Sequence, residues 1–82
     1  MAIIRLPQVK AEFGYRSNAS VYNAIRDGLF TKPVPIGRRS VGWPDDEVKT
    51  ICAARIAGKS ENDIRELVSR LLAKRAELLT SI

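Results

Sequence analysis

Two consecutive arginines, Arg38 and Arg39, have the clearest chemical potential in this sequence, because they follow Gly37 within a segment of alternating apolar residues. A sharp turn at Gly37 would project both guanidinium groups beyond the rest of the fold. Fixed cations of this kind bind phosphate oxygens or enter the narrow minor groove of a nucleic-acid duplex. We therefore predict that both arginines contact DNA. The alternative is an exposed basic turn without a partner.

Polar side chains also mark the start and one face of a predicted helix that begins after Ser17. A step of about 100° per residue places Asn23 opposite Val21, where its amide can bond an adenine edge in two places. Recognition helices usually meet bases or phosphates near their N-terminus. The residues there are Ser17, Asn18, Ala19 and Ser20. Ala19 is suited to a thymine methyl. The competing interpretation is solvated surface for Asn23 and helix capping for the others.

A phenol and three further cations flank these elements. The hydroxyl of Tyr22 either bonds a phosphate or lies in water while its ring packs on the preceding helix, and both alternatives stay open. Arg16 and Arg26 bracket the helix, and Lys32 lies at the base of the predicted hairpin. The predicted DNA-binding residues are therefore Arg16, Ser17, Asn18, Ala19, Ser20, Tyr22, Asn23, Arg26, Lys32, Arg38 and Arg39.

A helix-turn-helix is predicted to position the first group of these side chains. The first helix covers residues 7–13, because Pro7 suits a first helical position and Gly14 suits a helix end. Its apolar face is Leu6, Val9 and Phe13. Ser17 is placed to cap a second helix over residues 18–26, which Asp27-Gly28 ends. The inward face of this second helix is Val21, Ala24 and Ile25.

A hairpin, or wing, is predicted to position the arginines. Pro33 and Pro35 lack N–H groups on the same edge of an extended segment, so we expect that strand to have one partner strand. Val34 and Ile36 share one face before the turn, and the alternation resumes beyond it at Val41 and Trp43. Residues 37–40 form the tip, and Trp43 is expected in the core.

Two more helices are predicted after the wing. Three acids open a third helix that runs to Gly58, and acids in a first turn are favourable to the helix macrodipole. Its predicted apolar stripe is Val48, Ile51, Cys52 and Ile56. Ser60 is placed to cap a fourth helix of about twenty residues. Its stripe is Ile64, Leu67, Val68, Leu71, Leu72, Leu78 and Leu79. Arg75 interrupts this stripe and would fit poorly in the dry core of a monomer without a partner.

Length and composition bound the function. A chain of 82 residues forms one small domain, and a net charge of +5 favours a polyanionic partner. Histidine is absent and cysteine occurs once, so this sequence cannot build a zinc finger, a disulfide framework or a Cys-His nucleophile. It also has no P-loop or nucleophile elbow, so we predict no enzyme activity, cofactor or metal. Without a long apolar run, we predict no membrane segment and a cytoplasmic, nucleoid-associated protein.

The order helix, turn, helix, Arg-tipped wing, Trp and acidic-start helix resembles the AlpA family of phage and prophage regulators, within the MerR- and excisionase-like winged-helix group. The residues that carry this resemblance are Leu6-Pro7, Gly14, Ser17, Val21-Tyr22, Ile25, Gly28, Phe30, Lys32-Pro33-Val34, Ile36-Gly37-Arg38, Val41-Gly42-Trp43 and Glu47-Val48. They span roughly residues 5–57, about two-thirds of the chain. The resemblance implies DNA binding, with roles in the transcriptional control of prophage genes or in excision. The turn at 14–17 is one residue longer than the commonest family turn, and the last helix extends past the usual family end.

Together these features predict a mainly α fold with one β-hairpin. A winged helix-turn-helix over residues 1–58 is followed by a long C-terminal helix over residues 59–82, which extends the same domain. The predicted function is site-specific binding of double-stranded DNA by a transcriptional regulator of a prophage or integrative element, with helix 18–26 in the major groove. Alternatives are a DNA-bending excisionase and a protein-interaction module that uses the C-terminal helix. Predicted partners are DNA, a second copy of the chain in a homodimer through that helix, and integrase or RNA polymerase.

Overall fold

The computed structural model describes residues 2–80, with the side chains of positions 79 and 80 left out. The Leu79 side chain, predicted in the apolar stripe of the last helix, therefore lies outside the described residues. So do Met1, at the start of the predicted range 1–58, and residues 81–82, at the end of the predicted range 59–82. The elements, in chain order, are β1 (Ile3–Ile4), α1 (Leu6–Phe13), α2 (Asn18–Arg26), β2 (Val34–Pro35), β3 (Val41–Pro44), α3 (Asp45–Ile56) and α4 (Glu61–Thr80). The fold is mainly helical, with a small antiparallel sheet, as the sequence predicted.

Helices α1 and α2 form the helix-turn-helix, and local signals set its boundaries. Gly14 ends α1 in the left-handed region with a φ of 72°, a conformation that glycine adopts without steric cost. Ser17 then caps α2, because its side-chain oxygen accepts the N–H of Ser20 at 3.2 Å. The predicted boundaries of α2 are confirmed.

The sheet has one strand more than the predicted hairpin. Its order is β1-β3-β2, and both pairings are antiparallel. The strand β2 pairs with β3 alone, as the two prolines predicted, whereas the two-residue strand β1 was missed. Ile4 of β1 lies opposite Trp43 of β3. Gly42 makes this close approach possible, since a Cβ at that position would collide with the Ile3 side chain and lie 3.0 Å from the Ile4 carbonyl oxygen.

The core is centred on Trp43, which is fully buried. Its indole N–H donates to the carbonyl of Thr31 at 2.8 Å, and its ring stacks on Phe30 with centroids 5.5 Å apart. The other buried apolar residues are Val9, Val21, Ala24, Val48, Ile51, Ile64 and Val68. The predicted core role of Trp43 is confirmed. The predicted stripe of α3 is wrong at its end, because the Ile56 side chain is 83% exposed.

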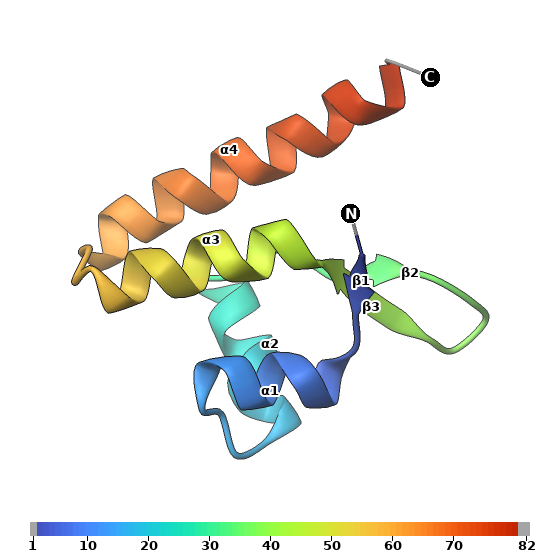
Figure 1. Cartoon of the computed structure of the whole chain (residues 1–82), viewed down its shortest axis with the longest axis horizontal. Coiled ribbons are helices and arrows are strands. Elements are labelled where there is room, and N and C mark those ends of the chain that lie inside the picture. The colour runs from blue at the N-terminus through green and yellow to red at the C-terminus, as the bar shows by residue number, and fades with distance from the viewer. Residues whose placement is uncertain (1, 81–82) are drawn as a thin grey trace.

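Helix α3 lies between α4 on one side and the helix-turn-helix on the other (Figure 1). Ile64 and Val68 of α4 are buried in the common core, and Leu71 packs against it half-buried. Arg75 of α4 forms two hydrogen bonds to the buried carboxylate of Glu47, at 2.8 and 2.6 Å. Arg75 therefore finds its partner within the same chain, in α3, and its place in the apolar stripe does not require a second copy of the chain. No helix of residues 2–80 is long and apolar enough to cross a membrane.

Candidate nucleic-acid interface

The outward face of α2 is polar and uncovered. Val21 and Ala24 point into the core, so the opposite side of the helix faces solvent. The exposed residues of α2 are Asn18, Ala19, Tyr22, Asn23 and Arg26. Tyr22 is 44% exposed, which leaves its ring available at the margin of this face. The orientation predicted for Asn23, away from Val21, is the one that the structure has.

The two predicted serines at the start of α2 have a structural role. The Ser17 hydroxyl caps the helix, and the hydroxyls of Ser17 and Ser20 lie 3.1 Å apart, within hydrogen-bond distance of each other. Ser17 is exposed and Ser20 is half-buried. This arrangement is the capping alternative that the sequence left open for this region. The first backbone N–H groups of α2, those of Asn18 and Ala19, have no partner within the helix. Anions are favoured at such a helix start.

The loop between β2 and β3, which forms the tip of the wing, extends away from the helices (Figure 1). Arg38 and Arg39 are both exposed, in the tip between β2 and β3. The tip is closed by the Ile36 N–H, which donates to the Ser40 carbonyl at 2.9 Å. Lys32 is exposed ahead of β2 and Arg16 is exposed in the turn before α2. The predicted cations are thus all on the surface, on the wing and on the segments that flank α2.

Sequence reasoning missed Arg5. This residue is exposed between β1 and α1, and its guanidinium donates to the Ser40 hydroxyl of the wing at 3.4 Å. The contact brings a third arginine to the wing, in addition to Arg38 and Arg39. The only signal for it is non-local, because it depends on β1 pairing with β3.

Charge is unevenly distributed along the chain. Residues 14–43 contain Arg16, Arg26, Lys32, Arg38 and Arg39 as cations, and Asp27 as their acid. Asp27 forms an ion pair with Arg26 at 3.4 Å, but both side chains are at least half-exposed, so the pair is weak and leaves Arg26 available.

The three acids at the start of α3 have separate internal roles rather than forming a site. Asp45 accepts the backbone N–H of Ala2 at 3.2 Å, and this hydrogen bond lowers the pKa of the Asp45 carboxyl below its ordinary value. Asp46 accepts the N–H of Glu47 at 3.0 Å, and Glu47 pairs with Arg75. Among residues 2–80, no three His, Cys, Asp or Glu side chains are placed to hold a metal ion. The thiol of Cys52 is half-buried and donates to the Glu12 carbonyl at 3.7 Å.

A comparison with protein families finds one match. Residues 2–56 match the sequence model of a family described as "Prophage CP4-57 regulatory protein (AlpA)". This chain belongs to the AlpA family. The matched segment is about two-thirds of this AlpA-family protein and nearly coincides with the residues that carried the resemblance. No curated protein and no solved structure matches the chain.

The family match divides the structure in a useful way. It includes the helix-turn-helix, the sheet and α3, and with them every predicted DNA-binding residue of this AlpA-family protein. Helix α4 lies entirely outside it. The family match therefore covers the winged helix-turn-helix and α3, and α4 needs an explanation of its own.

Proposed function

We propose that this protein binds double-stranded DNA site-specifically and regulates transcription of a prophage or integrative element. Helix α2 would enter the major groove, and the wing would contact the adjacent backbone or minor groove. One observation carries the proposal: the exposed face of α2 and the exposed arginines of the wing belong to one basic segment, residues 14–43, that lies within the family match. Nucleic-acid phosphates are the polyanion that such a segment suits best.

Each predicted residue has a role within this proposal. Asn23 reads a base edge in the major groove, and Asn18 and Ala19 meet bases or phosphates at the start of α2. Arg38 and Arg39 bind phosphate or the minor groove from the wing, with Arg5 behind them. The phosphate contacts on the flanks come from Tyr22, Arg16, Arg26 and Lys32. Ser17 and Ser20 fix the first turn of α2, and their hydroxyls lie near the helix start, where a recognition helix meets bases or phosphates.

The first experiment is selection of bound sequences. Random duplex DNA is retained on the purified protein at two salt concentrations, and the retained fragments are sequenced. A recurring motif at both salt concentrations is the expected result. Retention of fragments without a motif, lost at the higher salt, would limit the protein to non-specific electrostatic binding and overturn the proposed specificity.

The wing is tested by the double variant Arg38→Ala with Arg39→Ala. Affinity is expected to fall on the selected motif and on random DNA alike, and the salt slope should fall by about 1 per lost phosphate contact. The matched control is Lys59→Ala with Arg70→Ala, which removes two exposed cations that lie outside residues 14–43 and outside the family match. An equal effect of both double variants would mean that net charge alone, and not the wing, determines binding.

The recognition face is tested by Asn23→Ala. This change should cost about 1–3 kcal/mol on the selected motif, relax one base position, and leave random DNA nearly unaffected. Gln8→Ala is the control, since it removes an exposed amide from α1. An equal loss of affinity for the motif and for random DNA would mean that Asn23 contacts the DNA backbone rather than a base.

Excision, homodimerisation and recruitment of integrase or RNA polymerase stay predictions. DNA bending and an integrase-dependent excision assay separate an excisionase from a transcriptional regulator. Light scattering tests the homodimer through α4, for which Arg75 no longer argues because Glu47 of the same chain already pairs with it. The protein-interaction alternative is disfavoured by Ile64 and Val68, which are buried in the chain's own core.

A further inference from the structure

The C-terminal end of α2 needs hydrogen-bond donors, because the last carbonyls of a helix have no partner within it. The turn after the helix satisfies part of this need. The Gly28 N–H donates to the Ile25 carbonyl at 3.1 Å, and the Leu29 N–H donates to the Ala24 carbonyl at 2.8 Å. Gly28 has a φ of +78°, so the chain leaves α2 through a left-handed turn. The carbonyl of Asp27, at the outer edge of this turn, remains to be paired.

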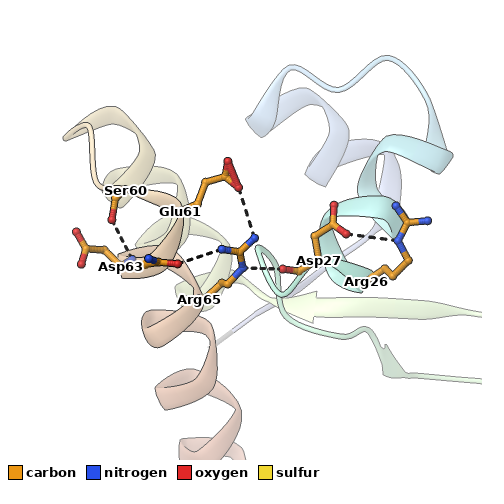
Figure 2. Close-up of polar contacts among 7 residues, drawn as sticks. Arg26, Asp27, Ser60, Glu61, Asp63 and Arg65 are labelled. Carbon is orange, nitrogen blue, oxygen red and sulfur yellow. Dashed lines mark hydrogen bonds and ion pairs between the residues drawn. The ribbon is translucent and has the colours of Figure 1, made fainter.

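Arg65 of α4 supplies the donor. Its Nε donates to the Asp27 carbonyl oxygen at 2.9 Å, across 38 positions of sequence (Figure 2). Two residues of the first turn of α4 orient the guanidinium. Its Nη1 donates to the Asn62 side-chain oxygen at 3.2 Å, and its Nη2 forms an ion pair with Glu61 at 3.5 Å. The planar group is therefore held on several sides, which a lysine ammonium cannot reproduce.

The aliphatic part of Arg65 also contacts the turn. A Cβ added at Gly28 would lie 3.5 Å from the Arg65 Cγ, so the side chain crosses directly over this glycine. Its cationic end reaches the C-terminus of α2, where positive charge is favourable to the helix dipole. Immediately before Arg65, Ile64 is buried in the core, and this anchors the helix that carries the arginine.

From these contacts we infer that Arg65 is a positioning residue for DNA recognition: it ties the C-terminal end of α2 to α4 and thereby fixes the angle at which α2 meets DNA. The inference rests on the proposed function, and it gives a role to a helix that lies outside the family match. Side chains that discriminate bases must be held within about 0.5 Å of their productive geometry. The N-terminal half of α2 is anchored by Val21, which is fully buried in the core, so a second constraint at Asp27 sets the direction of the helix axis.

The test compares Arg65→Met with Arg70→Met. Both variants remove one positive charge from α4, and methionine keeps an unbranched apolar stem, so general attraction to DNA changes equally. We expect Arg65→Met to bind the selected motif about tenfold more weakly, the size of one lost charge-assisted hydrogen bond. The salt slope should stay unchanged, because Arg65 touches no phosphate in this scheme. Arg70→Met should stay within about twofold of the natural protein.

A second readout needs no DNA. Amide hydrogen exchange at Gly28 and Leu29 should speed up about tenfold in Arg65→Met, while exchange at Val21 stays as in the natural protein. Asn62→Ala removes an orienting acceptor without changing charge, and it should show the same two effects at about threefold. This milder variant carries the test if Arg65→Met fails to fold.

Three outcomes overturn the inference. Equal motif affinity of the Arg65 and Arg70 variants would mean that α4 does not position α2. A lower salt slope for Arg65→Met would make Arg65 a phosphate contact. Unchanged exchange at Gly28 and Leu29 would mean that the Asp27 contact does not hold the turn. If the natural protein selects no motif, the proposed function fails, and the exchange measurement still decides whether Arg65 holds the end of α2.

Discussion

Removing the cation from the buried ion pair between α3 and α4 is the sharpest test of this fold. The Glu47 side chain is 5% exposed and that of Arg75 is 18% exposed, with Nε and Nη2 of the arginine at 2.8 and 2.6 Å from the two carboxylate oxygens. The change Arg75→Met keeps an unbranched apolar stem at this position, one helical turn after Leu71, and leaves the Glu47 carboxylate buried without a cation. Breaking a buried pair in this way costs about 3–5 kcal/mol.

We expect a loss near the lower limit, about 3 kcal/mol, because water reaches part of the Arg75 side chain. A domain of this length has a free energy of unfolding of about 4–12 kcal/mol, so this single change removes a quarter or more of it. The melting temperature should fall by roughly 4–8 °C for each kcal/mol lost.

Urea unfolding monitored by tryptophan fluorescence measures this loss directly. The sequence has one tryptophan, and Trp43 is fully buried in the core, so its emission reports on the packed state. The matched control Arg70→Met, on the exposed side of α4, should change the free energy of unfolding by less than about 0.5 kcal/mol.

A double variant completes the test. Glu47→Leu combined with Arg75→Met replaces both charges by apolar groups and should return stability to within about 1 kcal/mol of the natural protein. A loss for Arg75→Met no larger than that of the Arg70 control would refute the ion pair. A double variant as unstable as Arg75→Met alone would refute the claim that the unpaired carboxylate causes the loss.

Three further predictions concern Thr31, Gly42 and Asp45. The buried Thr31 hydroxyl has no hydrogen-bond partner among the described residues, so Thr31→Val should raise the free energy of unfolding by about 1 kcal/mol. A decrease of that size in the free energy of unfolding, measured in urea, would mean that the hydroxyl is hydrogen-bonded. Gly42→Ala should cost about 1–3 kcal/mol, since its methyl group would displace Ile3; unchanged stability would show that β1 does not pack there. The Asp45 pKa is lowered below its ordinary value of 3.8, mainly by the hydrogen bond from the Ala2 N–H. The ionised Asp45 carboxylate therefore stabilises the fold at pH values above 3.8, and this contribution is lost as the pH falls through the folded-state pKa. Asp45→Asn should therefore flatten the dependence of the urea midpoint on pH below about 4, and an unchanged slope would contradict this assignment.

Local signals account for the parts of the fold that could be predicted. The cap at Ser17 and the stop at Asp27-Gly28 depend on residues within a few positions, so the boundaries of α2 were predictable from sequence. The alternation around residues 37–40 likewise identified the wing. The outward orientation of Asn23 followed from helical periodicity alone.

Long-range contacts account for what could not be predicted. The strand β1 has two residues and no periodicity of its own, and it forms because β3 offers an edge about forty positions away. The acids in the first turn of α3 were explained by the helix dipole, which is a local effect. The pairing of Glu47 with Arg75 was therefore not predicted. Ile56 fitted the apolar period of α3, but its side chain faces solvent, whereas Ala54 two positions earlier packs against the core. Which residues touch DNA stays a prediction, because exposure and charge do not identify a partner.

The burial of Glu47 beneath α4 has a consequence for partly folded states of the chain. Arg75 of α4 lies 28 positions after Glu47 of α3, so the two halves of the ion pair belong to different helices. In any state in which α4 is detached, the face of α3 that α4 covers is open to solvent, and the Glu47 carboxylate lies within that face. Exposed apolar surface makes partly folded chains prone to aggregation. The charge that Arg75 neutralises in the folded protein thus keeps the partly folded chain from presenting an entirely apolar surface to other chains.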